Sequence, residues 1–226
     1  MLSIRTLALS LMSLGLVVGQ TTEPCPPVPT LDLGAGVPPN PAHIPEGCSD
    51  YEILVARGTG EPNAPGGKFG VIVGDPVVTN TTLQLPGARG YPVQYPASID
   101  TTGVSQGSAD VVSRIRRQAL RCPRQTFSLV GYSQGAAVMH AAAGDIPRYL
   151  YPRIKSLVMF GDGYNRLGFL GRFPTGLNDK ARQVCAPGDP ICDPDAGNCT
   201  YWHLVYVRPD YINPVVDFIV EGFTGN

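Results

Sequence analysis

Short apolar runs that stop at glycine or proline are spaced regularly along the chain after its first 50 residues. Runs of this length and composition are typical of strands buried inside a protein. The pattern predicts strands at residues 50–58, 90–97, 126–132, 153–161 and 181–186.

Helical patterns separate most of these runs. Apolar residues recur at helical spacing in residues 103–121, and an alanine-rich series follows in residues 134–143. A last helix is predicted over residues 212–223, with Asn213 as its N-cap and Pro214 in its first turn. Because strands that alternate with helices at this pitch form parallel sheets with helices on both faces, we expect an α/β fold.

Residues 71–85 carry two conflicting signals. Their valine, isoleucine and threonine content favours a strand. Asp75 followed by Pro76 is instead typical of a helix start. The local sequence does not choose between the two structures.

The first 47 residues differ from the rest in composition. Residues 1–19 combine a positive charge at Arg5 with an apolar stretch too short for a membrane span, which is typical of a signal peptide. Residues 20–47 hold eight prolines without sustained periodicity, so we expect an extended tail. The folded domain is therefore expected over residues 48–226 of an exported, extracellular protein.

Net charge excludes some classes of partner. The chain has 17 basic and 18 acidic residues, and cleavage of the leader removes Arg5, so the exported chain carries a net charge near −2. The sequence also has no basic run with interleaved aromatic residues. It therefore does not predict binding to nucleic acid or to anionic lipid.

Two segments match G-x-S-x-G, the pattern of a nucleophile elbow, in which a sharp strand-to-helix turn exposes a serine hydroxyl. They surround Ser105 and Ser133. Only Ser133 follows an apolar strand pattern, whereas Ser105 follows a polar, turn-like stretch and opens a helix. Ser133 is therefore the candidate nucleophile, and its flanking glycines are expected because side chains there would collide with the adjoining strand or helix.

A serine hydroxyl needs a base, and the chain has three histidines. His43 lies in the proline-rich tail, and His140 lies about 10 Å beyond Ser133 along the same helix. His203 follows the serine in the order nucleophile, acid, histidine that is typical of strand–serine–helix hydrolases. We therefore expect His203 to be the base.

The orienting acid is expected between the serine and the base, where the candidates are Asp145, Asp162, Asp179, Asp189, Asp193 and Asp195. Asp189 is preferred because Cys185 and Cys192 could close the loop that carries it, and a triad carboxylate needs a rigid mount. Asp193 and Asp195 are expected to be turn residues. They resemble the start of a calcium loop, but the glycine falls one place early and no terminal glutamate follows.

Six cysteines make an even set, which in an exported chain predicts three disulfides. Fifteen pairings are compatible with six cysteines. A metal site at the equally spaced Cys185, Cys192 and Cys199 is not favoured, because the chain has no CxxC pair and no histidine at ligand spacing.

With these features together, the chain resembles the cutinase and cutinase-like family of secreted serine esterases. The resemblance runs from about Cys48 to the C-terminus, and it rests on ARGTGE at 56–61, GYSQGAA at 131–137, CxxxDxxC at 185–192 and HL at 203–204. It implies a small α/β-hydrolase with three αβα layers, a central, mostly parallel sheet and no lid domain. It also implies a monomeric carboxylic ester hydrolase that needs no cofactor or metal.

The resemblance assigns roles residue by residue. It makes Ser133 the nucleophile, His203 the general base and acid, and Asp189 the orienting carboxylate. It places the oxyanion-hole donors at the backbone N–H groups of Gln134 and Thr59.

The resemblance also bears on the cysteines and on one helix. It pairs Cys48 with Cys122 and Cys185 with Cys192, which leaves Cys25 and Cys199 for each other. In residues 71–85 it implies a helix.

The substrate is expected to be apolar in its acyl part. Residues 165–177 and 200–206 place apolar and aromatic side chains near the expected site, which favours cutin, other hydrophobic polyesters and fatty acyl esters. Trp202 either lines the acyl groove or packs in the core. An acetylxylan-type carbohydrate esterase is an alternative, and so is a non-catalytic binding or elicitor protein, against which the complete set of triad residues argues.

Two sequons complete the candidate sites. Asn80 in NTT is a candidate for glycosylation. Asn198 in NCT is the weaker candidate, because Cys199 is expected in a disulfide.

Overall fold

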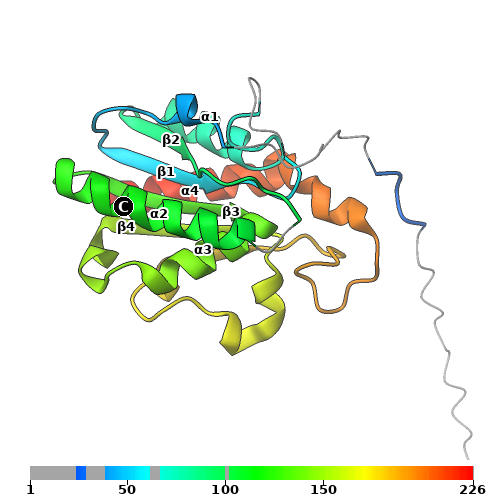
Figure 1. Cartoon of the computed structure of the whole chain (residues 1–226). Helices are drawn as coiled ribbons and strands as arrows, with labels where there is room; N and C mark the ends of the chain where they lie inside the picture. The colour runs from blue at the N-terminus through cyan, green and yellow to red at the C-terminus, as the bar shows by residue number, and fades with distance from the viewer. Residues whose placement is uncertain (1–23, 29–38, 62–66, 100–101, 226) are drawn as a thin grey trace, which may run out of the picture.

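The computed structural model describes residues 24–28, 39–61, 67–99 and 102–225 (Figure 1). Within them, five strands form one sheet in the order β2-β1-β3-β4-β5, and every neighbouring pair is parallel. The strands are β1 (Tyr51–Ala56), β2 (Ala88–Pro92), β3 (Thr126–Tyr132), β4 (Ile154–Phe160) and β5 (Ala181–Val184).

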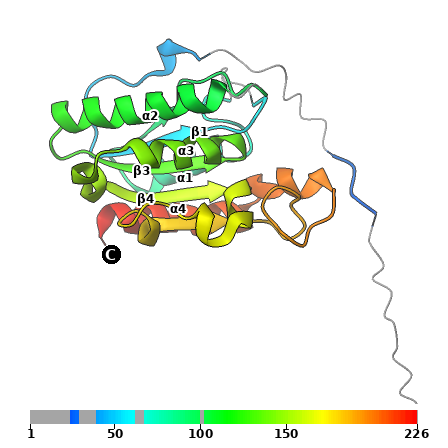
Figure 2. The ribbon, with the colours of Figure 1, turned by 60° about the horizontal axis from the view of Figure 1, so that its bottom comes forward.

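Four α-helices cover the two faces of this sheet. Helices α2 and α3 pack together on one face, and α1 and α4 pack together on the other (Figures 1 and 2). Their bounds are α1 (Gly74–Gln84), α2 (Thr102–Arg121), α3 (Gln134–Asp145) and α4 (Pro209–Thr224). The expected three-layer α/β-hydrolase arrangement is therefore confirmed.

Short 3₁₀ helices precede β1 and lie in several of the later connections. They are η1 (Pro41–His43), η2 (Arg148–Arg153), η3 (Gly163–Gly171), η4 (Asn178–Lys180) and η5 (Thr200–Val207). Of these, η5 contains His203, and η3 follows β4 and borders a separate pocket that is described below.

Strand β1 shows why its sequence is apolar without alternation. Leu54 and Ala56 pack into the core beneath α2 and α3, whereas Ile53 and Val55 pack into the core beneath α1 and α4. Successive side chains of a strand point to opposite faces, and both faces of a parallel sheet are covered. The continuous apolar run is therefore the expected signature of a central strand.

The conflict in residues 71–85 is resolved in favour of a helix. Asp75 accepts a hydrogen bond from the N–H of Phe69 over 2.9 Å, and the valines Val77 and Val78 are buried in the core shared with α4. Burial against α4 thus outweighs the intrinsic strand preference of the β-branched residues.

Two predicted boundaries were wrong. Helix α4 begins at Pro209 rather than beside Asn213, because Pro209 itself supplies a fixed φ at the first helical position. Pro214 consequently lies inside the helix. The strand predicted at residues 90–97 is instead β2, which ends at Pro92 because its partner β1 ends at Ala56.

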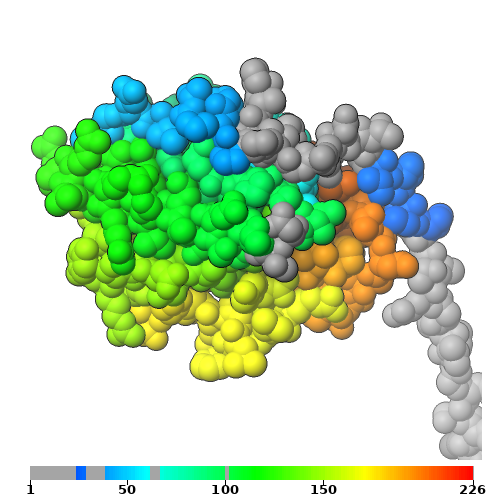
Figure 3. Space-filling model, in the orientation of Figure 1, coloured from blue at the N-terminus to red at the C-terminus, as the bar shows by residue number. Residues whose placement is uncertain are grey.

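Three disulfides hold the described residues together: Cys25–Cys199, Cys48–Cys122 and Cys185–Cys192. The resemblance implied the second and third of these pairs, and Cys25–Cys199 is the pair that was predicted because the other four cysteines had partners. All three cysteines of the disfavoured metal site are in disulfides. In the space-filling view, residues 24–28 lie against the surface of the segment that contains η5 (Figure 3).

The predicted signal peptide and residues 20–23 and 29–38 of the predicted tail lie outside the described residues. Among the helices that the structure describes, none has both the length and the apolar character needed to cross a bilayer.

Candidate active site

Ser133 stands at the turn between β3 and α3. Its φ is 54° and its ψ is −118°. Among the other described non-glycine residues, only Ala97 has a positive φ. Its N–H donates to the carbonyl of Phe160 on β4 over 2.9 Å, which fixes the turn to the sheet. A strained backbone held by its neighbours, with a half-buried side chain, is the geometry of a nucleophile elbow.

The glycines of the elbow are required by close contacts. A methyl group at Gly131 would lie 2.6 Å from the carbonyl oxygen of Gly135, and one at Gly135 would overlap the carbonyl oxygen of Ala56 on β1. The two glycines of the G-x-S-x-G pattern are therefore needed because α3 packs closely against β1 and β3.

His203 and Asp189 complete a chain of hydrogen bonds from Ser133. His203 Nε2 lies 2.9 Å from Ser133 Oγ, and His203 Nδ1 lies 2.8 Å from Asp189 Oδ2. The His203 side chain is 14% exposed, and Asp189 is fully buried. With Asp189 ionised, Nδ1 carries the imidazole proton, and Nε2 is free to accept a proton from the serine.

Asp189 is held from several directions. Tyr206 donates its hydroxyl proton to Oδ2, and the N–H of Ile191 donates to Oδ1 over 2.8 Å. Burial raises the pKa of Asp189, but these hydrogen bonds and those with His203 outweigh burial and hold the pKa below its ordinary value. The carboxylate therefore stays ionised beside the imidazole.

The Asp189 loop is closed by the disulfide between Cys185 and Cys192. The N–H of Ala186 donates to the Tyr206 hydroxyl over 3.1 Å, so the same tyrosine contacts both the loop and its aspartate. Burial raises the pKa of Tyr206, and its hydrogen bond to Asp189 raises it further, so the hydroxyl remains a donor.

His203 is fixed by its neighbours in the sheet. Tyr132, the residue before the nucleophile, donates from its hydroxyl to the carbonyl of His203 over 2.7 Å, and its ring stacks on the imidazole. Gly161 follows β4 with a φ of 55°, and a methyl group there would lie 2.6 Å from His203 Cε1. This glycine leaves room for the imidazole.

The other candidates lie elsewhere. The Ser105 hydroxyl is exposed on α2 and donates to the carbonyl of Thr102 over 2.9 Å. Asp193 accepts hydrogen bonds from the N–H groups of Gly188 and Asp195, which confirms it as a turn residue.

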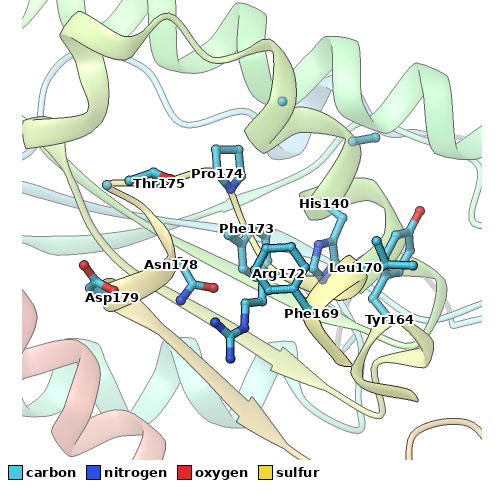
Figure 4. A pocket seen from close by; sticks show the side chains of 13 residues that line it. His140, Tyr164, Phe169, Leu170, Arg172, Phe173, Pro174, Thr175, Asn178 and Asp179 are labelled. Carbon is cyan, nitrogen blue, oxygen red and sulfur yellow. The ribbon is translucent and has the colours of Figure 1, made fainter. Parts of the chain in front are cut away.

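His140 belongs to a different cluster. It bonds to Asp162 over 2.8 Å, and its ring is stacked between Tyr164 and Phe173. His140, Tyr164 and Phe173 line a pocket of about 600 Å³ that is bordered by η3 and by the loop before β5 (Figure 4). Neither Ser133 nor His203 lines this pocket, so the histidine is separate from the elbow, as its sequence position predicted.

The two expected oxyanion donors follow adjacent strands. Gln134 is the first residue of α3, and the first N–H groups of a helix have no intrahelical partner. Thr59 lies three residues after β1, which pairs with β3. Because the carboxyl ends of parallel strands share one edge, both amides lie at the edge of the sheet that carries Ser133.

Trp202 packs against the core of the domain, which is one of the two positions expected for it. It is half-buried against the core beneath α1 and α4, and a methyl group at Gly188 would lie 2.9 Å from its indole ring. Trp202 thus covers the backbone of the Asp189 loop.

The sequence analysis missed Tyr206 and Tyr132 as parts of the site. Tyr132 adjoins the nucleophile in the elbow pattern, and Tyr206 is one 3₁₀ turn after His203. Their positions beside the two expected residues were the signal that was available.

The family model named Cutinase matches residues 47–223. The chain therefore belongs to the cutinase family. This cutinase is 33% identical over 193 residues to the probable carboxylesterase Culp3 of Mycobacterium tuberculosis, a match that covers 80% of this chain and 72% of the relative.

Solved structures agree with this assignment. A cutinase of Trichoderma reesei in complex with a phosphonate inhibitor superposes with a TM-score of 0.65 at 30% identity, covering 78% of this chain and 77% of that one. The catalytic core of an acetyl xylan esterase from the same organism has a TM-score of 0.64 at 22% identity and covers 76% and 98%. The second likeness supports the fold alone. This cutinase is a carboxylic ester hydrolase.

Proposed function

We propose that this cutinase cleaves esters through an acyl-enzyme on Ser133. His203 Nε2 takes the hydroxyl proton while Oγ attacks the ester carbonyl, and the carbonyl π electrons move onto oxygen. Collapse of this intermediate breaks the bond to the alcohol, which receives the proton from His203. Water, deprotonated by the same imidazole, then releases the acid.

One observation carries the proposal. Hydrogen bonds run without interruption from Ser133 through His203 to the buried carboxylate of Asp189. The Oγ–Nε2 distance is 2.9 Å, and the Nδ1–Oδ2 distance is 2.8 Å. A serine on a strained turn, a base within reach and a fixed third group are the parts that nucleophilic catalysis needs.

In the same proposal, the N–H groups of Gln134 and Thr59 stabilise the oxyanion. Gln134 offers an amide at a helix N-terminus, where the helix dipole also favours negative charge. The Gln134 side chain donates to the carbonyl of Ser98 over 2.6 Å, which anchors the turn from the other side. Amide donors held in place before the reaction stabilise a developing negative charge without having to reorganise.

The proposed substrates are esters with apolar acyl groups, with cutin and other hydrophobic polyesters as the polymeric examples. Ile99 follows the residue that bonds to Gln134, and Ile191 lies two residues after Asp189; their side chains are 90% and 41% exposed. On η3, which protrudes from the surface in Figure 3, Leu167, Phe169 and Leu170 are exposed as well. Apolar side chains around the catalytic edge favour an apolar substrate over acetylated xylan.

The proposal includes export and a monomeric state. Three disulfides among the described residues fit an oxidising, extracellular environment. Mass spectrometry of the secreted protein, before and after glycosidase treatment, would test cleavage after Gly19 and a glycan on Asn80, which lies half-buried on α1.

The matched serines provide the test of the reaction. Ser133→Ala is expected to lower kcat for p-nitrophenyl butyrate by several orders of magnitude, because the nucleophile is lost. Ser105→Ala is expected to leave kcat unchanged, because its hydroxyl only bonds to Thr102 within α2. Equal losses in the two variants would show that the elbow is misassigned.

A substrate panel provides the test of the acyl preference. We expect kcat/KM to be higher for p-nitrophenyl butyrate and octanoate than for the acetate, together with release of soluble acids from a polyester film. Faster deacetylation of acetylated xylan than of any of these esters would instead favour the carbohydrate esterase.

A further inference from the structure

We propose that the Glu61 carboxylate is a positioning group that holds the turn of Thr59 in the geometry of the oxyanion hole. The inference rests on the proposed function, because it concerns the donor assigned there to Thr59. It gives a role to a buried acid that the triad does not use.

Glu61 closes the Thr59 turn twice. The N–H of Glu61 donates to the carbonyl of Gly58 over 3.2 Å, and the N–H of Gly58 donates to Glu61 Oε2 over 2.6 Å. Thr59 is the second residue of the four-residue turn between them. Its backbone orientation therefore depends on both bonds to Glu61.

The second carboxylate oxygen reaches another part of the chain. Glu61 Oε1 accepts a hydrogen bond from the N–H of Ile72 over 2.9 Å, just before α1 begins. The side chain is 1% exposed. A methyl group at Gly70 would lie 2.6 Å from Oε2, so the backbone is shaped around the carboxylate.

The turn also lies against the elbow. A methyl group at Gly58 would lie 2.7 Å from the ring of Tyr132, whose next residue is Ser133. On its other side, the N–H of Gly60 donates to the carbonyl of Ala97 over 2.9 Å. Glu61 therefore fixes the turn from the interior, while other contacts fix it from the elbow and from the loop after β2.

Charged and titratable groups face Glu61 from each element around it. Arg57, at the end of β1, donates to the Glu61 carbonyl over 2.9 Å, and its charge favours the carboxylate. Asp75 of α1 disfavours the carboxylate. Tyr95 and Tyr132 also face it; burial raises the pKa of both hydroxyls, and the negative charge of Glu61 raises it further.

Burial dominates this balance and raises the pKa of Glu61 to about 7, although the hydrogen bonds from Ile72 and Gly58 and the charge of Arg57 lower it. An ionised carboxylate accepts both backbone N–H groups strongly. Protonation weakens these bonds, so the turn is held best above neutral pH.

The first readout uses the unmodified protein. If both His203 and Glu61 must be deprotonated, log(kcat/KM) for p-nitrophenyl butyrate falls more steeply below pH 7 than one ionisation allows. An acid limb with the slope of a single proton at every pH would overturn the proposal.

The second readout is the Glu61→Gln variant. One amide oxygen cannot accept from both Gly58 and Ile72, and the NH₂ group would face a donor. We expect kcat to fall about 10- to 100-fold, as for a weakened oxyanion donor, with KM within twofold of its original value. Below pH 7, the slope of log(kcat/KM) against pH is expected to fall to the value for a single ionisation.

Two further variants complete the design. Glu221→Gln, on the exposed face of α4, is the matched control and should change neither kcat nor the pH profile. Glu61→Asp keeps the charge and should recover part of kcat together with the steeper acid limb. Glu61→Gln with unchanged kcat and an unchanged acid limb would overturn the inference.

The Ser133→Ala variant separates this inference from the function on which it rests. Retained esterase activity in Ser133→Ala would refute the proposed reaction, whatever Glu61 does. An inactive Ser133→Ala beside a fully active Glu61→Gln would refute only the role of Glu61.

Discussion

The hydroxyl of Tyr206 makes two hydrogen bonds to the loop that carries Asp189. It donates to Asp189 and accepts from the N–H of Ala186. The ring meets those of Tyr132, Phe160 and Tyr211 edge-on, so its position is set by packing as well. A phenylalanine at this position would keep the packing and lose only the hydroxyl.

Tyr206→Phe is therefore expected to lower kcat/KM by roughly 10- to 100-fold. A hydrogen bond to a charged group contributes about 1.5–3 kcal/mol, and the pKa of Asp189 should rise when one is lost. The measurement is the hydrolysis of p-nitrophenyl butyrate across pH 4–8. Tyr211→Phe is the control, because Tyr211 touches the same ring without bonding to Asp189; equal effects of the two variants would contradict the prediction.

Glu61 also makes a prediction about stability. Its pKa in the folded protein, about 7, is above its ordinary value of 4.5, so the folded state binds the proton more tightly than the unfolded state. The stabilisation from this group is therefore complete below pH 4.5 and is lost as the pH rises through 7, by roughly 3 kcal/mol in total. The same ionisation that holds the Thr59 turn thus costs stability.

The measurement is the free energy of unfolding of the unmodified protein minus that of Glu61→Gln, from pH 4 to pH 9. This difference should decline between pH 4.5 and pH 8. A difference that is constant over this range would contradict the raised pKa.

At the scale of elements, α3 is the helix whose placement decides the site. Its first turn lies so close to β1 that Gly135 has no room for a side chain, whereas nothing lies within 4 Å of a methyl group at Gly144 near its end. The same substitution should therefore have opposite effects at the two ends of one helix.

Gly135→Ala is expected to destabilise the protein by roughly 3 kcal/mol or more and to reduce activity, since α3 must move away from β1. Gly144→Ala is expected to stabilise it by about 0.5–1 kcal/mol, since alanine loses less backbone entropy in a helix. Thermal unfolding and kcat of both variants check this. A similar change in Tm for both would mean that the close approach of α3 does not limit stability.

The elements that the sequence predicted well are those with strong local patterns. Strands β1 and β3 are continuous apolar runs, and α2 has a clear helical periodicity, so burial and local preference agree in them. Helix α1 was ambiguous because its β-branched residues are helical only through their packing on α4. Pro209 and Pro214 each suit a helix start, and the sequence does not rank them.

The site divides in the same way. Ser133, Asp189 and His203 could be chosen from chain order and local pattern. The hydrogen bond from Tyr206 to Asp189 joins residues 17 positions apart, and those from Gly58 and Ile72 converge on Glu61 only after folding. Such contacts depend on tertiary structure, so local patterns do not reveal them.

At the scale of the whole molecule, the Cys25–Cys199 disulfide joins residues 174 positions apart. Cys199 is four residues before His203 and immediately precedes η5, so the N-terminal segment is anchored beside the base. In the chain-entropy model, a loop of this length contributes roughly 5 kcal/mol.

Replacing both cysteines, in Cys25→Ser/Cys199→Ser, is expected to lower Tm by several degrees and to reduce kcat modestly, because η5 loses its anchor. Peptide mapping without reduction should recover Cys25 linked to Cys199 in the unmodified protein. Recovery of Cys25 as a free thiol or linked to another chain would contradict the pairing, and an unchanged Tm would show that the anchor adds no stability.

This disulfide also has a consequence for the order in which the protein matures. Chains are made from the N-terminus, so Cys25 is synthesised first, and its partner follows 174 residues later. The Cys48–Cys122 bond can close after fewer than half as many residues. The segment that carries His203 is therefore among the last parts to be cross-linked, and activity should appear late, after the core of the domain has formed.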